Sequence, residues 1–234
     1  MKVVLGIGNP GRKYEGTRHN VGHRVVDRAA AALGAEMKRR RHGGLVGEAA
    51  PGGRAGGERV VLVKPATYVN LSGECARAVL DYHGAGPESL LVVADDVNLP
   101  LGEIRARRSG SSGGHKGLLS VAAHLGTEEF ARLRVGVGRP PAATAERGTR
   151  NAERGTVPPS PRGESGVEGE VGDLVGHVLG VFSREERELM DAAEARAAEA
   201  AVEWALRGID ACMNRFNGPA PGSGRPGADG GEAG

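Results

Sequence analysis

A short apolar run at residues 3–5 leads directly into a glycine-rich stretch at residues 6–11, and this junction constrains the fold most. An apolar run bounded by glycine is typical of a buried strand, and the glycines let the chain turn at its carboxyl end. In an open α/β sheet, ligands bind at that end of the strands. The turn and the residues after it carry Asn9, Tyr14 and His19, so we expect a functional cleft there.

The glycines at 6, 8 and 11 also match the Gly-x-Gly-x-x-Gly pattern of dinucleotide-binding proteins. That pattern binds a pyrophosphate only where a helix opens directly after the glycines. Here Pro10 interrupts the loop, residues 12–17 are polar, and helical spacing of apolar residues begins only near Asn20. A dinucleotide-dependent oxidoreductase therefore remains a minor alternative, which binding of NAD or FAD would reveal.

Composition favours one globular domain that has neither a cysteine metal site nor a membrane-spanning segment. The 234 residues suffice for one domain with a sizeable core. The net charge of +2 excludes a polycation, but basic residues cluster locally, as for an anionic partner. Cys75 and Cys212 show neither metal-ligand spacing nor a disulfide framework, which predicts reduced thiols. The first apolar run is too short for a signal peptide and none spans a bilayer, so we expect a cytoplasmic protein.

Apolar runs and helical patterns alternate along the chain, with one hairpin. This order predicts a single three-layer α/β/α domain with a twisted mixed sheet. Strands are expected at 3–5, 45–49, 58–63, 90–94, 103–108 and 132–138, and helices at about 20–33, 73–83, 117–124 and 183–206. Asn20 is expected to cap the first helix, and Ser183 with Glu186 forms a capping box for the last.

Two segments differ sharply in composition from the rest. Residues 140–172 are polar, rich in proline and glycine, and contain a near-tandem duplication at 145–149 and 152–156. Such a stretch buries too little to offset its ordering entropy, so we predict a disordered insertion inside a domain spanning 1–217. Residues 218–234 are expected to be a disordered tail.

Basic residues concentrate in three places. Arginines alternate with apolar residues at 103–108 and 132–138, which predicts half-exposed strands with a basic outer face that includes Arg107 and Arg134. Residues 38–42 contain a further run of basic residues. That run fits a solvated loop or an RNA-facing surface, and the sequence does not choose between them.

The predicted strand ends bring polar and aromatic side chains to one edge of the sheet, namely Asn9, His19, Tyr68, Asn70, Asp95 and His115. A histidine beside a carboxylate can take a proton from water, while the carboxylate fixes its tautomer. Carboxamides can donate to a developing oxyanion. Asp95 and Asp96 could alternatively only cap the following turn. The chain has no Gly-x-Ser-x-Gly elbow, so these residues indicate a hydrolase without a covalent intermediate.

Several long motifs, in order, resemble the bacterial peptidyl-tRNA hydrolase family. They are residues 6–11, Tyr14, residues 17–20 and 64–73, the Asp95-Asp96 pair before Leu99-Pro100, and residues 113–115 and 178–182. The resemblance covers residues 1–139 and about 173–217. It implies an α/β enzyme, without metal or cofactor, that cleaves the ester between a peptide and the 3′ ribose of tRNA.

The resemblance also implies roles for individual residues. His19 matches the catalytic base, Asp95 its carboxylate partner and Asn9 the amide that orients the ester. Tyr14 and Tyr68 match aromatic residues that line the cleft, and Asn70 matches an amide that holds the peptide or the terminal nucleotide. Arg107 and Arg134 match a clamp on the tRNA 5′-phosphate. We also expect His115 and Lys116 to bind the substrate or tRNA. A cytoplasmic monomer that contacts the acceptor stem is expected.

Lys116 departs from the family pattern, which usually has asparagine after Gly-Gly-His. Lysine donates hydrogen bonds but accepts none, so an amide role at this position is in doubt. Its charge would instead favour a phosphate of the CCA end. A non-catalytic RNA-binding relative of the same fold remains an alternative, although Asn9, His19 and Asp95 argue against it.

Overall fold

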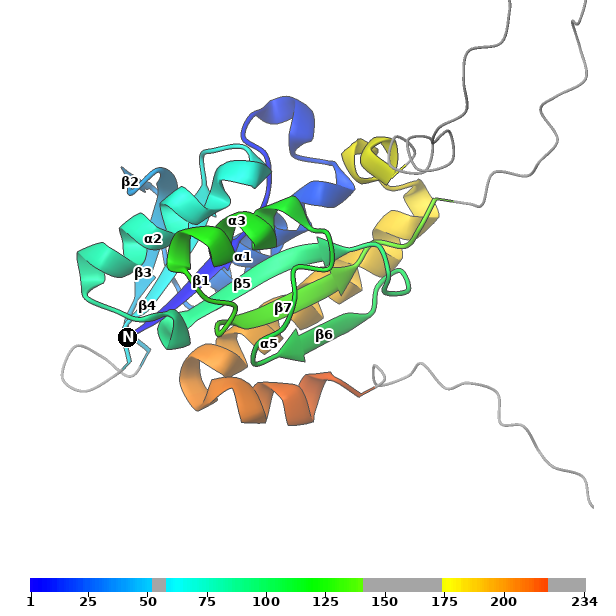
Figure 1. Cartoon of the computed structure of the whole chain (residues 1–234). Coiled ribbons are helices and arrows are strands. Elements are labelled where there is room, and N and C mark those ends of the chain that lie inside the picture. Colours follow the sequence, from blue (N-terminus) through cyan, green and yellow to red (C-terminus); the bar gives the residue numbers. More distant parts are fainter. Residues whose placement is uncertain (52–57, 141–173, 219–234) are drawn as a thin grey trace, which may run out of the picture.

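The computed structural model describes residues 1–51, 58–140 and 174–218 (Figure 1). Within these ranges, seven strands form one mixed sheet in the order β2-β3-β4-β1-β5-β7-β6. The strands are β1 Lys2–Gly6, β2 Arg39–Arg41, β3 Gly44–Ala49, β4 Val60–Pro65, β5 Leu90–Asp96, β6 Ile104–Arg107 and β7 Ala131–Gly136. The helices are α1 Val21–Ala32, α2 Ser72–His83, α3 Lys116–Leu125 and α5 Arg184–Phe216. Short 3-10 turns are η1 Arg12–Tyr14, η2 Arg18–Asn20, η3 Val69–Leu71 and η4 Pro87–Ser89.

The four central strands β4, β1, β5 and β7 are parallel, and β2, β3 and β6 add antiparallel pairs at the two edges. Carboxyl ends of parallel strands lie at the same sheet edge. The loops after β1, β4 and β5 therefore start side by side, which confirms the predicted edge.

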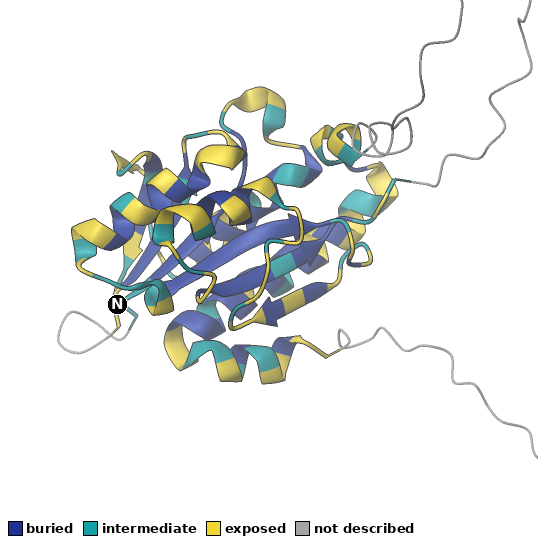
Figure 2. Cartoon of the chain, in the orientation of Figure 1, coloured by how far each residue is buried: buried dark blue, intermediate teal, exposed yellow. Residues whose placement is uncertain are grey.

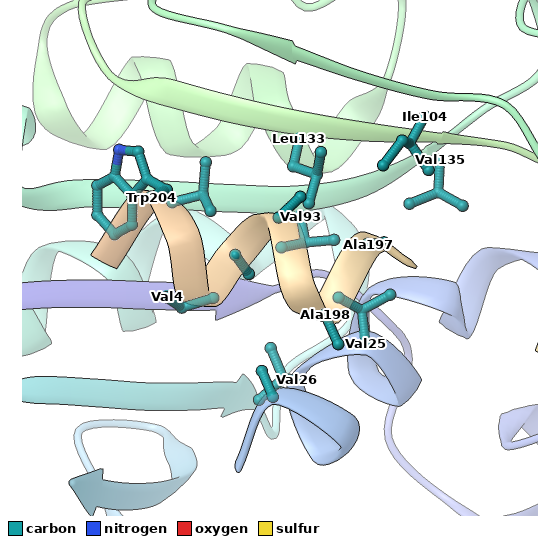
Figure 3. Close-up of a cluster of buried hydrophobic side chains, with 14 of the residues drawn as sticks. Val4, Val25, Val26, Val93, Ile104, Leu133, Val135, Ala197, Ala198 and Trp204 are labelled. Atoms are coloured by element: carbon teal, nitrogen blue, oxygen red, sulfur yellow. The ribbon is translucent and has the colours of Figure 1, made fainter. Parts of the chain in front are cut away.

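Helices cover both faces of the sheet, with α2 and α3 on one side and α1 and α5 on the other (Figure 1). Strand residues alternate between the two cores: Val3 and Leu5 face α2, whereas Val4 belongs to the core under α1 and α5. Figure 3 shows part of the second core, around Val93 and Trp204. Exposed residues lie mainly on the outer helix surfaces (Figure 2). The predicted three-layer α/β/α fold is confirmed.

The local predictions also held in part. The apolar face of α1 is buried as expected, and the capping box of Ser183 and Glu186 starts α5. Residues 39–41 are not a loop but the edge strand β2, whose three arginines are all exposed. Residues 209–216, for which the sequence allowed either an extension of the last helix or a short turn, extend α5 to Phe216 after a break at Gly208, where φ is 84°.

The predicted insertion at 140–172 and tail at 218–234 lie outside the described residues, apart from their first positions, so the domain bounds stay predictions. None of the helices in the described part of the chain has the length and apolar character needed to span a bilayer.

Candidate active site

The glycine loop after β1 leads into η1 and η2, and α1 begins only at Val21. Only the single 3-10 turn η1 follows the glycines directly, not an α-helix N-terminus, and the dinucleotide-binding geometry is not formed. The loop instead carries Asn9 to the carboxyl edge of the sheet, where Asp95 is the next-to-last residue of β5.

Asn9 is held by Asn20. The Asn20 Oδ1 accepts from the Asn9 backbone N–H at 2.8 Å, and the Asn20 Nδ2 donates to the Asn9 carbonyl at 2.9 Å. The side-chain Oδ1 of Asn9 accepts from the Val69 N–H at 3.1 Å, so its Nδ2 is the group left to donate. Asn20 stands at the predicted N-cap position, but its side chain makes no cap hydrogen bond, and this part of the prediction was wrong.

The position of His19 depends on the chain segment that precedes α5. The Arg18 N–H donates to the Gly180 carbonyl at 2.9 Å, and the Arg18 guanidinium pairs with Glu186 at 2.7 Å. Thr17 forms an isolated bridge with Val181. These contacts fix η2, and with it His19, against a segment more than 150 residues away in sequence.

His19 and Asp95 form a close pair, with 2.7 Å between the His19 Nδ1 and the Asp95 Oδ1. Burial by itself would lower the pKa of His19, but the Asp95 charge and hydrogen bond outweigh it, and the pKa is raised. Burial would raise the pKa of Asp95, yet His115 and His19 hold it well below its usual range. Asp95 is therefore an ionised acceptor, His19 donates through Nδ1, and the His19 Nε2 is left for substrate or water.

The two neighbouring carboxylates have different tasks. The Asp96 Oδ1 accepts from the Asn98 N–H at 2.8 Å and so caps the turn, while its Oδ2 pairs with Arg134 at 2.9 Å. Asp95 faces His19 and His115 instead. The turn-cap alternative thus holds for Asp96 alone.

His115 also faces Asp95, with 2.9 Å between its Nε2 and the same Oδ1 that contacts His19. The ring centroids of the two histidines are 5.2 Å apart. His115, which we expected to bind substrate, thus contacts the carboxylate that pairs with His19. Sequence reasoning missed this contact, since it arises only when the loop after β6 lies over the end of β5.

The residues that we expected to bind the peptide and the CCA end lie around η3. The rings of Tyr14 and Tyr68 meet edge to face with centroids 6.5 Å apart, and the Tyr68 side chain is 53% exposed. Asn70 is exposed beside Val69, the residue that binds the Asn9 amide. Lys116 is exposed at the first position of α3.

The basic strands place four arginines on the sheet face opposite α5. Arg105 pairs across the strands with Arg134, and Arg107 with Arg132. Arg107 is exposed as predicted, but Arg134 is half-buried and donates to the Ser111 carbonyl at 2.7 Å as well as to Asp96. The two expected clamp residues share a face, but not the same exposure.

His19, Asp95 and His115 also offer the composition of a metal site, with ligand atoms all within 4.8 Å of one another. The His115 Nδ1 accepts from the Gly117 and Leu118 N–H groups at 3.1 and 3.3 Å. Its Nε2 must then carry the ring proton, and a metal would need the lone pair of that atom. The hydrogen bonds therefore suit proton transfer better than metal binding.

Comparison with known proteins agrees with the geometry. The family model for peptidyl-tRNA hydrolase matches residues 3–150. Two similar relatives are the peptidyl-tRNA hydrolases of Caldanaerobacter subterraneus subsp. tengcongensis, 42% identical over 218 residues, and of Halalkalibacterium halodurans, 42% identical over 217 residues. Each alignment covers 93% of this chain and 100% of the relative.

The fold agrees as well. The crystal structure of peptidyl-tRNA hydrolase from Acinetobacter baumannii superposes with a TM-score of 0.72 at 30% sequence identity, covering 93% of this chain and 94% of that one. A second crystal structure, of a peptidyl-tRNA hydrolase in complex with N-propanol, gives the same values. Sequence and fold thus agree over nearly the whole chain, which belongs to the peptidyl-tRNA hydrolase family.

Proposed function

We propose that this chain hydrolyses the ester bond between a peptide and the 3′ ribose of tRNA, with His19 as general base. The observation that carries the proposal is the His19–Asp95 pair beside the free amide donor of Asn9, in a chain of this family. This combination supplies a base, an orienting carboxylate and an oxyanion donor, the three elements that ester hydrolysis by water needs.

The reaction follows from the tautomer of His19. Its Nε2 takes a proton from water, and the water oxygen attacks the ester carbonyl carbon. Asp95 stabilises the imidazolium that forms, and the Asn9 Nδ2 donates to the oxyanion. The tetrahedral intermediate then expels the ribose 3′ oxygen, which receives the proton from His19. Peptide acid and free tRNA leave.

Water is the nucleophile that the residues favour. The two cysteines of the chain, Cys75 and Cys212, are buried, and burial raises the pKa of each thiol to about 12. Neither supplies a thiolate near neutral pH. A covalent intermediate on cysteine is therefore disfavoured.

The substrate would lie across the carboxyl edge of the sheet. We expect the peptide and the CCA end to contact Tyr14, Tyr68, Asn70 and Lys116. The shared face of Arg107 and Arg134 supports a contact with phosphate of the acceptor stem. Every group needed for this reaction comes from one chain, so we expect the enzyme to act as a monomer.

The test is release of labelled peptide from a peptidyl-tRNA by the purified protein. We expect turnover with wild type and a large loss with His19→Ala. A peptidyl-tRNA that wild type binds without cleaving would instead indicate a non-catalytic RNA-binding protein. Binding of NAD or FAD would contradict the proposal.

A further inference from the structure

The hydrogen bonds of His115 determine its protonation state. Its Nδ1 accepts two backbone N–H groups at the start of α3, from Gly117 and Leu118, so that nitrogen carries no proton. Its Nε2 faces the Asp95 Oδ1 at 2.9 Å. Because an ionised carboxylate only accepts hydrogen bonds, this nitrogen must donate. Both contacts independently require the same neutral tautomer, with hydrogen on Nε2.

A second proton on His115 is unfavourable for a geometric reason. It would have to sit on Nδ1, pointing at two N–H donors and at the positive end of the α3 dipole. Among the described residues, Asp95 and His19 are the titratable groups that contact this ring, and Lys116, next in sequence, is exposed. The hydrogen bonds therefore make His115 a donor to Asp95 through Nε2.

The backbone around His115 is firmly held. Arg132 and Arg134 both donate to the Ser111 carbonyl in the loop that leads to it. At the other side, Gly117 packs so closely on Ile7 and Val69 that a Cβ atom would lie 2.9 and 3.0 Å from their side chains. The ring therefore has a fixed position relative to the end of β5.

We propose that His115 is a positioning residue, a tautomer-locked neutral donor that fixes the Asp95 carboxylate for its partner His19. The proposal rests on the proposed function, in which Asp95 serves His19. A neutral donor orients the carboxylate without cancelling its charge, and that charge remains available to stabilise the His19 imidazolium. A lysine or arginine in this place would neutralise the carboxylate.

The two hydrogen-bonding tasks of His115 can be separated by substitution. Asparagine is a favourable N-cap residue, so His115→Asn keeps an acceptor for α3 but is too short to reach Asp95. Glutamine reaches about as far as Nε2, so His115→Gln can restore the donor while losing the cap. His115→Ala loses both.

Kinetics of these variants test the positioning role. We expect His115→Asn to keep the melting temperature and KM but to lower kcat about 10- to 100-fold, the range for a lost hydrogen bond to a charged group. The rising limb of its pH–rate profile should move to higher pH. Without the hydrogen bond from His115, the Asp95 carboxylate stabilises protonated His19 more strongly and raises the pKa of His19 further. His115→Gln should recover part of kcat at a lower melting temperature. A rise in KM with unchanged kcat and limb would overturn the proposal in favour of substrate binding.

Imidazole nitrogen NMR of the wild type gives a second test that needs no activity. In its neutral form, His115 should show a bare Nδ1 and a protonated Nε2. A neutral ring with its proton on Nδ1 would refute the locked tautomer. Absent turnover with this tautomer present would refute the proposed function and leave the lock itself standing.

Discussion

Asn20 holds Asn9 by both ends of its side-chain amide, accepting from the Asn9 N–H and donating to the Asn9 carbonyl. Both side chains are buried, at 2% and 8% exposure. The same pair of hydrogen bonds recurs on the edge strand β6, where the Asn217 amide binds the N–H and carbonyl of Ala106 at 2.7 and 3.0 Å. The chain thus contains a matched pair of contacts, of which one orients a candidate catalytic residue.

We therefore expect Asn20→Ala to lower both stability and activity, and Asn217→Ala to lower stability alone and by less. Asn20→Ala leaves a backbone donor and acceptor unpaired, which costs about 1–3 kcal/mol per buried group, whereas water can replace the exposed Asn217 at the edge strand β6. Only Asn20→Ala should also lower kcat, since the Asn9 amide loses its fixed direction. Urea unfolding and peptide release check the two effects. Equal kcat values for both variants would mean that Asn20 has a purely structural role.

Removing the base should abolish most of the turnover. His19→Ala should lower kcat roughly 10²–10⁴-fold, the usual contribution of a positioned acid or base. Binding of tRNA should survive, because the basic face of β6 and β7 is untouched. Peptide release and a tRNA-binding titration measure the two effects, and near-wild-type turnover would rule out His19 as the base.

Asp95→Asn tests the partner of the base through pH. Asp95 raises the pKa of His19 in the wild type, so the active neutral base becomes abundant only as pH rises through that raised value. An amide cannot stabilise the imidazolium, so the rising limb of kcat/KM should move to lower pH while kcat falls. This shift is opposite to the one expected for His115→Asn. An unchanged limb would separate Asp95 from the titration of His19.

The sequence was sufficient for the strands and for the edge at which the site lies. Val3–Leu5 and Leu90–Ala94 are continuous apolar runs that must be buried on both faces, and polar side chains follow them directly. The edge strand β2 could not be recognised in the same way. Its arginines are all exposed, and backbone pairing with β3 defines it, which leaves no apolar pattern to read.

The side-chain contacts within the site could not be predicted from the sequence. Histidine is an unusual N-cap, so nothing in Gly113-Gly114-His115 indicated that the imidazole would bind both α3 and Asp95. The Arg134–Asp96 pair depends on β7 lying beside β5, and strand order is a tertiary property. Side-chain identities were thus predictable, but their partners were not.

His23 should make the fold sensitive to acid. Burial, with Lys64 and Arg24 nearby, lowers the pKa of His23 to about 3, and its Nε2 is buried without a hydrogen-bond partner among the described residues. The unfolded chain binds a proton below about pH 6.5 but the folded chain does not, so stability falls as pH drops from there toward 3. At pH 5 the loss amounts to about 2 kcal/mol.

His23→Phe removes the group that takes up a proton on unfolding but keeps a ring of similar size. The ring packs against Gly8, where a Cβ atom would lie 2.8 Å from it. Urea unfolding of both proteins at pH 5 and at pH 7.5 gives the comparison, in which other titrating groups cancel. The variant should lose less stability between the two pH values. Parallel losses would show that His23 is protonated in the folded protein.

The arginines of the basic face should separate substrate capture from chemistry. Arg107 is exposed, so Arg107→Ala should weaken capture of full-length peptidyl-tRNA about 10- to 100-fold and reduce the salt slope of binding by about one. A peptide on a short CCA fragment lacks the 5′-phosphate, and its kcat/KM should stay unchanged. Arg59→Ala serves as the control, because this exposed arginine directly precedes β4, at the sheet edge away from the site, and its loss removes the same charge.

Arg134→Ala should behave differently, because Arg134 pairs with Asp96 and supports the Ser111 carbonyl in the loop that leads to His115. Its loss leaves a buried carboxylate without its partner and loosens that loop. We therefore expect lower kcat/KM on both the full-length and the short substrate. The measurement is kcat/KM for the three variants on the two substrates. If Arg107→Ala impairs cleavage of both substrates equally, the phosphate clamp must be abandoned. If Arg134→Ala leaves cleavage of the short substrate unchanged, Arg134 contacts tRNA alone.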